Sequence, residues 1–358
     1  YYIKFMNKYY VVGIMSGTSL DGIDVVWSKL CFNKTWFYEI LDGKTYGYSS
    51  RWKSELQNAH KLQARDLVFL DKKLGNYIGE KINDFLNEKK IQKSQVDLIS
   101  SHGHTLFHEP ENNLTKQIGN GAYICSTTNI KTISDFRTID IAFGGQGAPL
   151  VPVGDKLLFG SYKGCLNLGG IANISYDFKE KRIAGDVNFA NMISNYLSNK
   201  IGHSFDKDGE LAKQGKIDGD LILKLEELDF YKKEFPKSLG VEDFNNWYKP
   251  LFENCKASLN DQLYTSGTHL CRTIKNIFNF DRNDALLITG GGAHNKFWIN
   301  KLKELKVKTV VPDLKLIDFK EALIFSLLGV LKIRNEINVL SSVTGSLKNL
   351  SSGVIHNP

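Results

Sequence analysis

One pattern that occurs twice in the chain constrains its fold more than any other feature. Residues 11–26 read VVGIMSGTSLDGIDVV and residues 164–178 read GCLNLGGIANISYDF. Each is an apolar strand, a turn of glycine and small polar residues, and a second strand. In a chain of 358 residues, this internal repeat predicts two lobes of related α/β design. We place the N-terminal lobe at residues 1–140, with 340–358 packing back on it, and the C-terminal lobe at 141–339.

The segments around the repeats predict further strands and helices. Residues 96–109 contain a buried strand that we expect to end at Gly103, and residues 131–137 predict a short strand. Residues 284–292, DALLITGGG, predict a strand that breaks into a third glycine turn before a helix. Residues 188–278 are mainly helical in pattern, and 319–337 predict a final apolar helix. Between Trp52 and Lys90, apolar residues recur every three or four positions, which indicates an amphipathic helix: Leu67, Leu70, Leu74, Ile78, Ile82 and Leu86.

The three glycine turns predict binding of nucleotide phosphates. Glycine lets backbone N–H groups come close to a ligand and point at it together. Thr18 and Ser19 add hydroxyl donors in the first turn, and no wall of Lys or Arg accompanies them. The third turn leads into a helix, whose N-terminus favours anions.

Two acids in the first turn, Asp21 and Asp24, predict a metal ion beside the phosphates. Carboxylates alone would repel a polyphosphate, and a Mg²⁺ ion held between them through water removes that repulsion. The P-loop pattern GxxxxGK[ST] and the protein-kinase signatures are absent from the sequence. The first turn is therefore interpreted as a phosphate-and-magnesium hairpin of another type.

Composition argues against several classes of partner. The net charge of +7 comes from scattered Lys residues, so we expect no nucleic-acid partner. No apolar run approaches the ~20 residues that span a bilayer, and the N-terminus lacks the zones of a signal peptide, so we expect no membrane association and a cytoplasmic location. The five cysteines show no metal-ligand or redox spacing, which indicates reduced, mostly buried thiols.

Two phosphate hairpins with a GGG turn resemble the actin/Hsp70/hexokinase superfamily, a ribonuclease H-like fold with an ATP cleft between two lobes. The motifs narrow the resemblance to the anhydro-N-acetylmuramic acid kinase family, whose pattern they match in order over nearly the whole chain. These motifs are MSGTSLDGID, SHGHTLFHEP, QIGNGA, SDFRTIDIAFGGQGAPLVP, LNLGGIANIS, FDKDGELAKQGKI, FPKSLG and TGGGAHN.

The resemblance implies a cytoplasmic, ATP-dependent and homodimeric bacterial enzyme of cell-wall recycling. Such an enzyme opens the 1,6-anhydro bond of anhydro-N-acetylmuramic acid with water, phosphorylates O6 and gives N-acetylmuramic acid 6-phosphate. The implied nucleotide-binding residues are Gly17, Thr18, Ser19, Leu20, Asp21, Gly22, Ile23, Asp24, Gly169, Gly170, Gly291 and Gly292. The implied sugar-binding residues are His104, Asp135, Arg137, Gln146, Gly147, Ala148 and Pro149.

The resemblance also implies the catalytic residues, and here the sequence departs from the family. The family's base is the Asp of an Asp-Thr-Gly-Pro-Gly-Asn stretch, and this chain has Asp186 and Asn191 at its ends with Val-Asn-Phe-Ala between them. Asp186 is either the base or a loop or helix-cap residue, and Phe189 is a candidate to fill space that the sugar needs. Glu321 matches a family Glu near the sugar, and its spacing from Asp318 also suits helix capping.

Three histidines and two competing functions stay open at this point. His102, His104 and His108 lie on a strand and loop, a weak pattern for a metal site. His104 stands where the family has Gln, so it either hydrogen-bonds the sugar or packs at a strand end. The departures leave two alternatives: a kinase of the same fold for a different sugar, or a non-catalytic nucleotide-dependent switch.

Overall fold

Two compact units make up the chain, and each has a sheet of its own. The computed structural model describes residues 7–17, 19–278, 281 and 284–358. Unit 1 comprises residues 1–158 and 319–358, and unit 2 comprises residues 159–318. The predicted lobe bounds, 1–140 with 340–358 and 141–339, stay a prediction beside these units.

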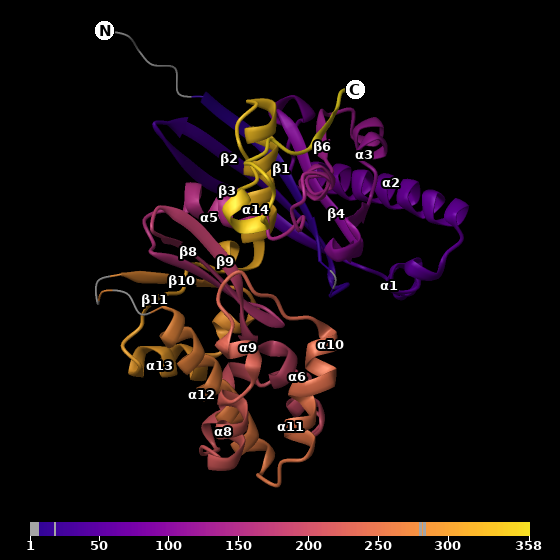
Figure 1. Cartoon of the computed structure of the whole chain (residues 1–358). Helices are drawn as coiled ribbons and strands as arrows, with labels where there is room; N and C mark the ends of the chain where they lie inside the picture. The colour runs from indigo at the N-terminus through magenta and orange to yellow at the C-terminus, as the bar shows by residue number, and fades with distance from the viewer. Residues whose placement is uncertain (1–6, 18, 279–280, 282–283) are drawn as a thin grey trace. The chain divides into compact units, whose positions relative to one another are not determined.

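The two sheets share one strand order, which is the structural form of the sequence repeat. The sheet of unit 1 runs β12-β6-β4-β1-β2-β3, with β5 added to β4, and that of unit 2 runs β11-β10-β7-β8-β9 (Figure 1). In both, the strand–turn–strand of the repeat opens a three-stranded antiparallel meander, and one further strand, β4 or β10, pairs parallel to its first strand. The predicted two-lobed α/β fold is confirmed.

Unit 1 contains the first repeat, and its sheet is covered by helices on both faces. Val12 and Ile14 of β1 pack with the apolar stripe of α2, while Gly13 faces α14. A Cβ on Gly13 would collide with the carbonyl oxygen of Ala322, so α14 approaches as closely as it does because residue 13 is glycine. The strands are β1 (Asn7–Ser16), β2 (Gly22–Asn33), β3 (Thr35–Gly47), β4 (Leu98–Glu109), β5 (Leu114–Ile118), β6 (Thr132–Ser134) and β12 (Val354–His356). The α-helices are α1 (Ser50–Gln57), α2 (Ala64–Glu88), α3 (Gly121–Thr128), α4 (Thr138–Ala142), α5 (Val151–Leu158), α15 (Ser341–Thr344) and, from Phe319, α14 (Leu314–Ile333).

Two expectations for unit 1 need correction. The strand expected to end at Gly103 continues to Glu109, because a left-handed backbone at Gly103 (φ 73°) and a register shift against β1 bend β4 without ending it. Beyond the bend, β4 pairs with β5. The helical pattern after Trp52 divides into α1, a short 3₁₀ turn and α2, and the six apolar positions of the predicted stripe all lie on α2.

Unit 2 packs its sheet against a set of helices dominated by α12. The core joins Leu166 and Leu168 of β7 to Leu270 and Ile274 of α12. The strands are β7 (Gly164–Leu168), β8 (Ile171–Phe178), β9 (Lys181–Phe189), β10 (Ala285–Thr289) and β11 (Lys308–Val310). The α-helices are α6 (Asn191–Asn199), α7 (Glu210–Lys213), α8 (Gly219–Glu226), α9 (Asp229–Lys232), α10 (Val241–Asp243), α11 (Lys249–Glu253), α12 (Leu259–Ile277) and α13 (Lys296–Glu304).

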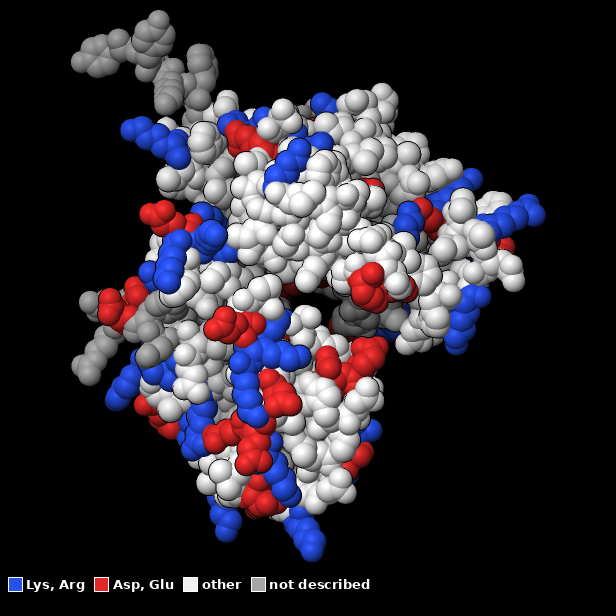
Figure 2. Space-filling view, viewed as in Figure 1, with Lys and Arg blue, Asp and Glu red and all other residues white. Residues whose placement is uncertain are grey.

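The helical surface of unit 2 carries charges of both signs. Figure 2 shows acidic and basic side chains interspersed over these helices. Ion pairs account for part of this mixture, including Lys213–Glu210, Lys224–Asp220 and Arg272–Glu226. None of the described helices is long and apolar enough to cross a membrane.

Candidate active site

The first glycine turn joins β1 to β2 and offers backbone rather than side-chain groups to a ligand. Thr18 lies outside the described residues. The N–H of Leu20 donates to the carbonyl of Gly17 at 3.3 Å, which closes the turn. Leu20 and Ile23 are buried in the core of unit 1, whereas Ser19 is exposed. Any contact that Leu20 or Ile23 makes with a nucleotide therefore comes from the backbone.

Gly17 and Gly22 of this turn differ in why a side chain is absent. A Cβ on Gly17 would meet only the hydroxyl of Ser19, at 3.5 Å, so its surroundings have room for a ligand. A Cβ on Gly22 would collide with the carbonyl oxygen of Tyr46 on the neighbouring strand β3. Gly22 is thus required by strand pairing, and Gly17 is the better candidate for phosphate contact.

Acidic groups in unit 1 create a negative field that suits a cation. Thr45 donates its hydroxyl to the Asp24 carboxylate at 2.5 Å, and Asp21 is exposed. Burial raises the pKa of Glu321, and the charge of Asp24 raises it further. No group of three or more metal-ligating side chains occurs among the described residues. A Mg²⁺ ion at Asp21 and Asp24 would therefore take most of its ligands from water and phosphate, as the sequence predicts.

Ser16, the last residue of β1, links the first turn to His104 in a way that the sequence did not reveal. The Ser16 Oγ lies 2.8 Å from the hydroxyl of Tyr48 and 3.1 Å from Nδ1 of His104. All three residues are buried, and Ser16 is paired in register with His104 on the neighbouring parallel strand. His104 is therefore neither isolated nor merely packed at a strand end, since β4 continues past it.

Arg137 is held by His102, whose protonation state follows from its two hydrogen bonds. Nδ1 of His102 lies 3.0 Å from the carbonyl oxygen of Gly103, so Nδ1 donates. Nε2 accepts from the Nε of Arg137 at 3.0 Å. Burial and the neighbouring guanidinium lower the pKa of His102 well below its usual range, so the ring is neutral. One Nη of Arg137 donates to the Gly147 carbonyl at 2.6 Å. This bond connects residues 135–137 (DFR) to the loop at residues 144–149 (GGQGAP).

Asp140 and Thr344 shape the GGQGAP loop. The buried Asp140 carboxylate accepts from the N–H of Gly147 and from the hydroxyl of Thr344, each at 2.8 Å. The Gln146 N–H donates to the Thr344 carbonyl, and Gln146 itself is exposed. Of the other predicted sugar residues, Ala148 is partly exposed, Pro149 is exposed, and Asp135 accepts from the N–H of Thr138 at the start of α4. Asp140 was missed because its role depends on a residue 204 positions away.

The capping role considered for Glu321 is wrong. Helix α14 begins at Leu314, and the Asp313 carboxylate accepts from the N–H of Leu316, so Asp318 and Glu321 lie inside the helix. Glu321 is partly buried beside charged groups of unit 1. Burial raises its pKa, and the charges of Lys320 and Arg137 oppose that increase.

The second and third glycine turns lie together in unit 2. The N–H groups of Asn191 and Met192 donate to the carbonyls of Gly169 and Gly170, and the Asn191 side chain donates to the Leu168 carbonyl. A Cβ on Gly291 would meet only the Asn191 amide nitrogen, at 3.7 Å. The retained Asn191 therefore organises the two turns that the sequence assigns to the nucleotide.

Gly291 and Gly292 offer a test of which glycine serves the ligand. A Cβ on Gly292 would lie 2.7 Å from both the Leu168 Cβ and the Trp298 ring, so Gly292→Ala should lower the thermal midpoint. Gly291→Ala has room and should fold like the wild type while weakening ATP binding about tenfold or more. Calorimetric titration with ATP and thermal melts measure both variants. Equal ATP affinity of Gly291→Ala and wild type would remove Gly291 from the nucleotide site.

Asp186 lies beside a bulge in β9 that separates it from Asn188. Asn173 is opposite Asp186, but the next residue of β8, Ala172, is opposite Asn188, so Val187 is the extra residue. The Asp186 carboxylate accepts from the N–H of Leu239 at 2.8 Å. Burial raises its pKa to about 6, against which that hydrogen bond acts. A carboxylate with this pKa is ionised at neutral pH and basic enough to take a proton.

The four residues between Asp186 and Asn191, which depart from the family pattern, are buried in unit 2. Phe189 is fully buried, with its ring centroid 4.6 Å from that of Tyr248 and 5.3 Å from that of Phe244. Asn188 accepts from the hydroxyl of Tyr231 at 2.6 Å and contacts Nδ1 of His269 at 3.1 Å. Phe189 thus packs in an aromatic cluster of unit 2, and its effect on the sugar stays a prediction.

Known proteins can now be compared with this arrangement. The family model described as anhydro-N-acetylmuramic acid kinase matches residues 9–358. The chain belongs to this family. It is 35% identical to the anhydro-N-acetylmuramic acid kinase of Aliivibrio fischeri, over 98% of this chain and 99% of that one. It is 34% identical to that of Clostridioides difficile, over 97% of this chain and 98% of that one.

Among solved structures, the chain resembles an activator of 2-hydroxyisocaproyl-CoA dehydratase from Clostridium difficile with bound ADPNP. The TM-score is 0.42 and the sequence identity is 11%, over 89% of this chain and 93% of that one.

Family membership confirms the sequence interpretation at the level of enzyme class. A kinase is a phosphotransferase, so the family supports an enzyme that uses ATP. The two alternatives, a kinase of the same fold for another sugar and a non-catalytic switch, are not favoured by relatives that carry one name at full coverage.

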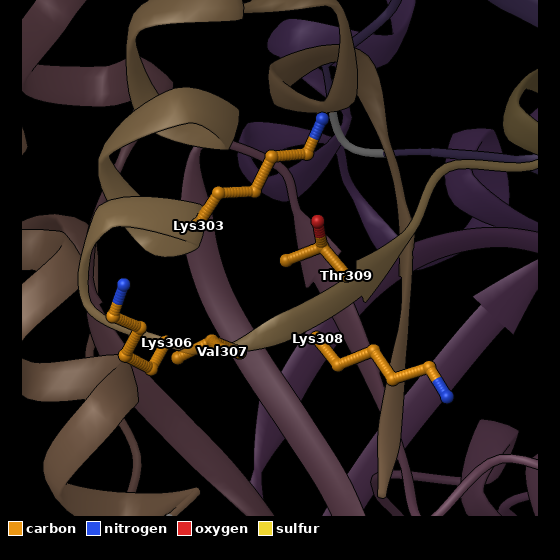
Figure 3. A pocket seen from close by; sticks show the side chains of 5 residues that line it. All are labelled: Lys303, Lys306, Val307, Lys308 and Thr309. Carbon is orange, nitrogen blue, oxygen red and sulfur yellow. The ribbon is translucent and has the colours of Figure 1, made fainter. Parts of the chain in front are cut away.

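A pocket of about 550 Å³ in unit 2 contains none of the predicted family residues. Its lining comes from the end of α13 and the start of β11 (Figure 3). Lysines are common at helix C-termini, where the helix dipole favours positive charge, and two basic residues lie in the last turn of α13. The lining residues are Lys303, Lys306, Val307, Lys308 and Thr309.

Proposed function

We propose that this protein uses ATP and Mg²⁺ to open the 1,6-anhydro ring of anhydro-N-acetylmuramic acid and to phosphorylate O6, giving N-acetylmuramic acid 6-phosphate. The observation that carries the proposal is the family match over residues 9–358. The partly buried Asp186 carboxylate, whose pKa is raised to about 6, supports the proposal, because the ring opening needs a base.

In the proposed reaction, water is the nucleophile and O6 becomes the phosphoryl acceptor. Asp186 takes a proton from water, the water oxygen bonds to the anomeric carbon, and the bond from that carbon to O6 breaks. The freed O6 bonds to the γ-phosphorus while the bond to the ADP leaving oxygen breaks. Of the proposed residues, Asp186 belongs to unit 2 and Arg137 to unit 1.

In this proposal, a cationic side chain of unit 1 binds the sugar and two of its carboxylates bind Mg²⁺. The Arg137 guanidinium, which donates to His102, would bind an anionic or hydroxyl oxygen of the sugar. Asp21 and Asp24 would hold Mg²⁺, which would neutralise phosphate charge during transfer. Glu321, with its raised pKa, is a second candidate for moving a proton.

The test is an assay of the purified protein with anhydro-N-acetylmuramic acid, ATP and Mg²⁺. ADP release that depends on this sugar, with a 6-phosphate product by mass spectrometry, is the expected result. Release of ADP only with another sugar, or nucleotide binding without turnover, would contradict the proposal. The cytoplasmic location, the ATP cleft between the lobes and the homodimer stay predictions, the last of which light scattering would measure.

The raised pKa of Asp186 predicts the acidic limb of the pH profile. The pKa of Asp186 is raised to about 6, so at a lower pH the base is protonated and inactive. We therefore expect kcat/KM to fall tenfold per pH unit below about pH 6. An Asp of ordinary pKa would stay ionised down to about pH 4. Because the pKa of Glu321 is also raised, the profile should be repeated for Asp186→Asn. A limb near pH 4, or one unchanged in this variant, would assign the titration to another group.

A further inference from the structure

A buried chain of hydroxyl groups ends at His104. Tyr48 on the segment after β3, Ser16 at the end of β1 and His104 on β4 are 6%, 1% and 4% exposed. The distances, 2.8 Å from Tyr48 to Ser16 and 3.1 Å from Ser16 to His104 Nδ1, are hydrogen-bond distances. These hydrogen bonds join Ser16 to residues that lie 32 and 88 positions further along the sequence.

The direction of this chain follows from the strengths of its donors and acceptors. A phenol is a far stronger acid than an aliphatic alcohol, and a neutral imidazole nitrogen is the strongest acceptor of the three groups. The favoured arrangement has Tyr48 donating to the Ser16 oxygen and Ser16 donating to Nδ1 of His104. Burial lowers the pKa of His104, so the ring is neutral and its single proton lies on Nε2.

The Nε2 atom of His104 is the free end of the chain. Within the described part of the chain, this atom makes no hydrogen bond, and it is not among the enclosed polar atoms without a partner. The neutral ring of His102, which accepts a hydrogen bond from Arg137, lies near His104. An N–H donor here is thus open to a ligand, beside the proposed sugar residues and next to the first glycine turn.

We propose that Tyr48 and Ser16 are positioning residues that fix His104 as a neutral Nε2–H donor to an oxygen of the sugar substrate. This inference rests on the proposed function and adds to it. We call the hydrogen-bonded chain Tyr48–Ser16–His104 the relay. It gives the site a donor that keeps its charge near neutral pH, whereas an unrestrained histidine changes its charge and tautomer in that pH range.

Two isosteric variants of His104 separate its two nitrogens. Asn places its amide near the Nδ1 position, whereas Gln extends its amide to the Nε2 position. His104→Asn should raise KM for the sugar about tenfold, with KM for ATP within about twofold of wild type. His104→Gln should rescue most of that loss. Ser16→Ala and Tyr48→Phe should each raise KM for the sugar several-fold. His203→Asn, an exposed histidine of unit 2, is the matched control.

The outcomes distinguish this inference from the proposed function. A wild-type protein without sugar-dependent turnover contradicts the proposed function itself. An active wild type with equal losses in His104→Asn and His104→Gln, or a loss of ATP affinity instead, overturns the relay. If a variant fails to fold, the ¹⁵N spectrum of histidine in the wild type decides directly. An Nε2–H tautomer of His104 from pH 6 to 8 supports the relay, and an Nδ1–H tautomer overturns it.

Discussion

Asp186→Asn should lower turnover by about 10² or more and leave ATP binding unchanged. Asn keeps an oxygen that accepts from the Leu239 N–H, so the bulged strand retains its 2.8 Å contact while the proton acceptor is lost. Because the wild-type carboxylate has a pKa raised by burial, the neutral amide should also leave the protein at least as stable at neutral pH. Single-turnover kinetics, ATP calorimetry and thermal melts measure the three quantities.

A surface carboxylate gives the matched control for this variant. Asp220 pairs with Lys224 on the exposed face of α8, and Asp220→Asn should leave turnover at the wild-type value. Wild-type turnover in Asp186→Asn would remove Asp186 from the mechanism. A parallel loss of ATP affinity would instead indicate that the carboxylate maintains the nucleotide turns.

Lys320→Met should destabilise the protein by about 3–5 kcal/mol, the loss expected when one partner of a buried ion pair is removed. The Lys320 ammonium lies 2.7 Å from the Asp155 carboxylate, and the two side chains are only 5% and 4% exposed. The pair joins α14, at the residue before Glu321, to α5, which follows the GGQGAP loop. Met has a similar shape but no charge, so the variant leaves the Asp155 carboxylate buried without its cation. Urea unfolding monitored by circular dichroism measures the change in midpoint.

Two further variants test the reason for this loss. Lys320→Met combined with Asp155→Leu should recover most of the stability, because the uncompensated charge is then absent. Lys224→Met, which breaks an exposed pair of the same chemistry on α8, should change the midpoint little. A midpoint for Lys320→Met that matches Lys224→Met would show that the buried pair does not stabilise unit 1.

The sequence predicted the parts of the site that are made by local pattern. Strand, glycine turn and strand follow one another within a few residues, so the turns at Gly17, Gly169 and Gly291 were visible without the fold. The pattern did not distinguish glycines with open space beside them, such as Gly17 and Gly291, from Gly22 and Gly292, which are fixed by packing. That distinction depends on which backbone or ring lies opposite.

Interpretations that depended on a side chain's surroundings were less secure. Spacing from Asp318 suggested that Glu321 caps a helix, but the helix begins earlier, at Leu314. Comparison with the family made Phe189 a candidate to fill space that the sugar needs, and only the structure shows that it packs against Tyr248 in a core formed by later helices. Burial and neighbours of this kind come from contacts distant in sequence.

The sequence by itself determined that this protein has two related α/β lobes, glycine turns between strands and membership of a sugar-kinase family, because these follow from periodicity and short motifs. Only the tertiary structure decided that Ser16 and Tyr48 orient His104, that His102 orients Arg137, and that a bulge sets Asp186 apart from Asn188. Each of these depends on strand register or on a hydrogen bond between distant segments, and neither is encoded in the spacing of neighbouring residues.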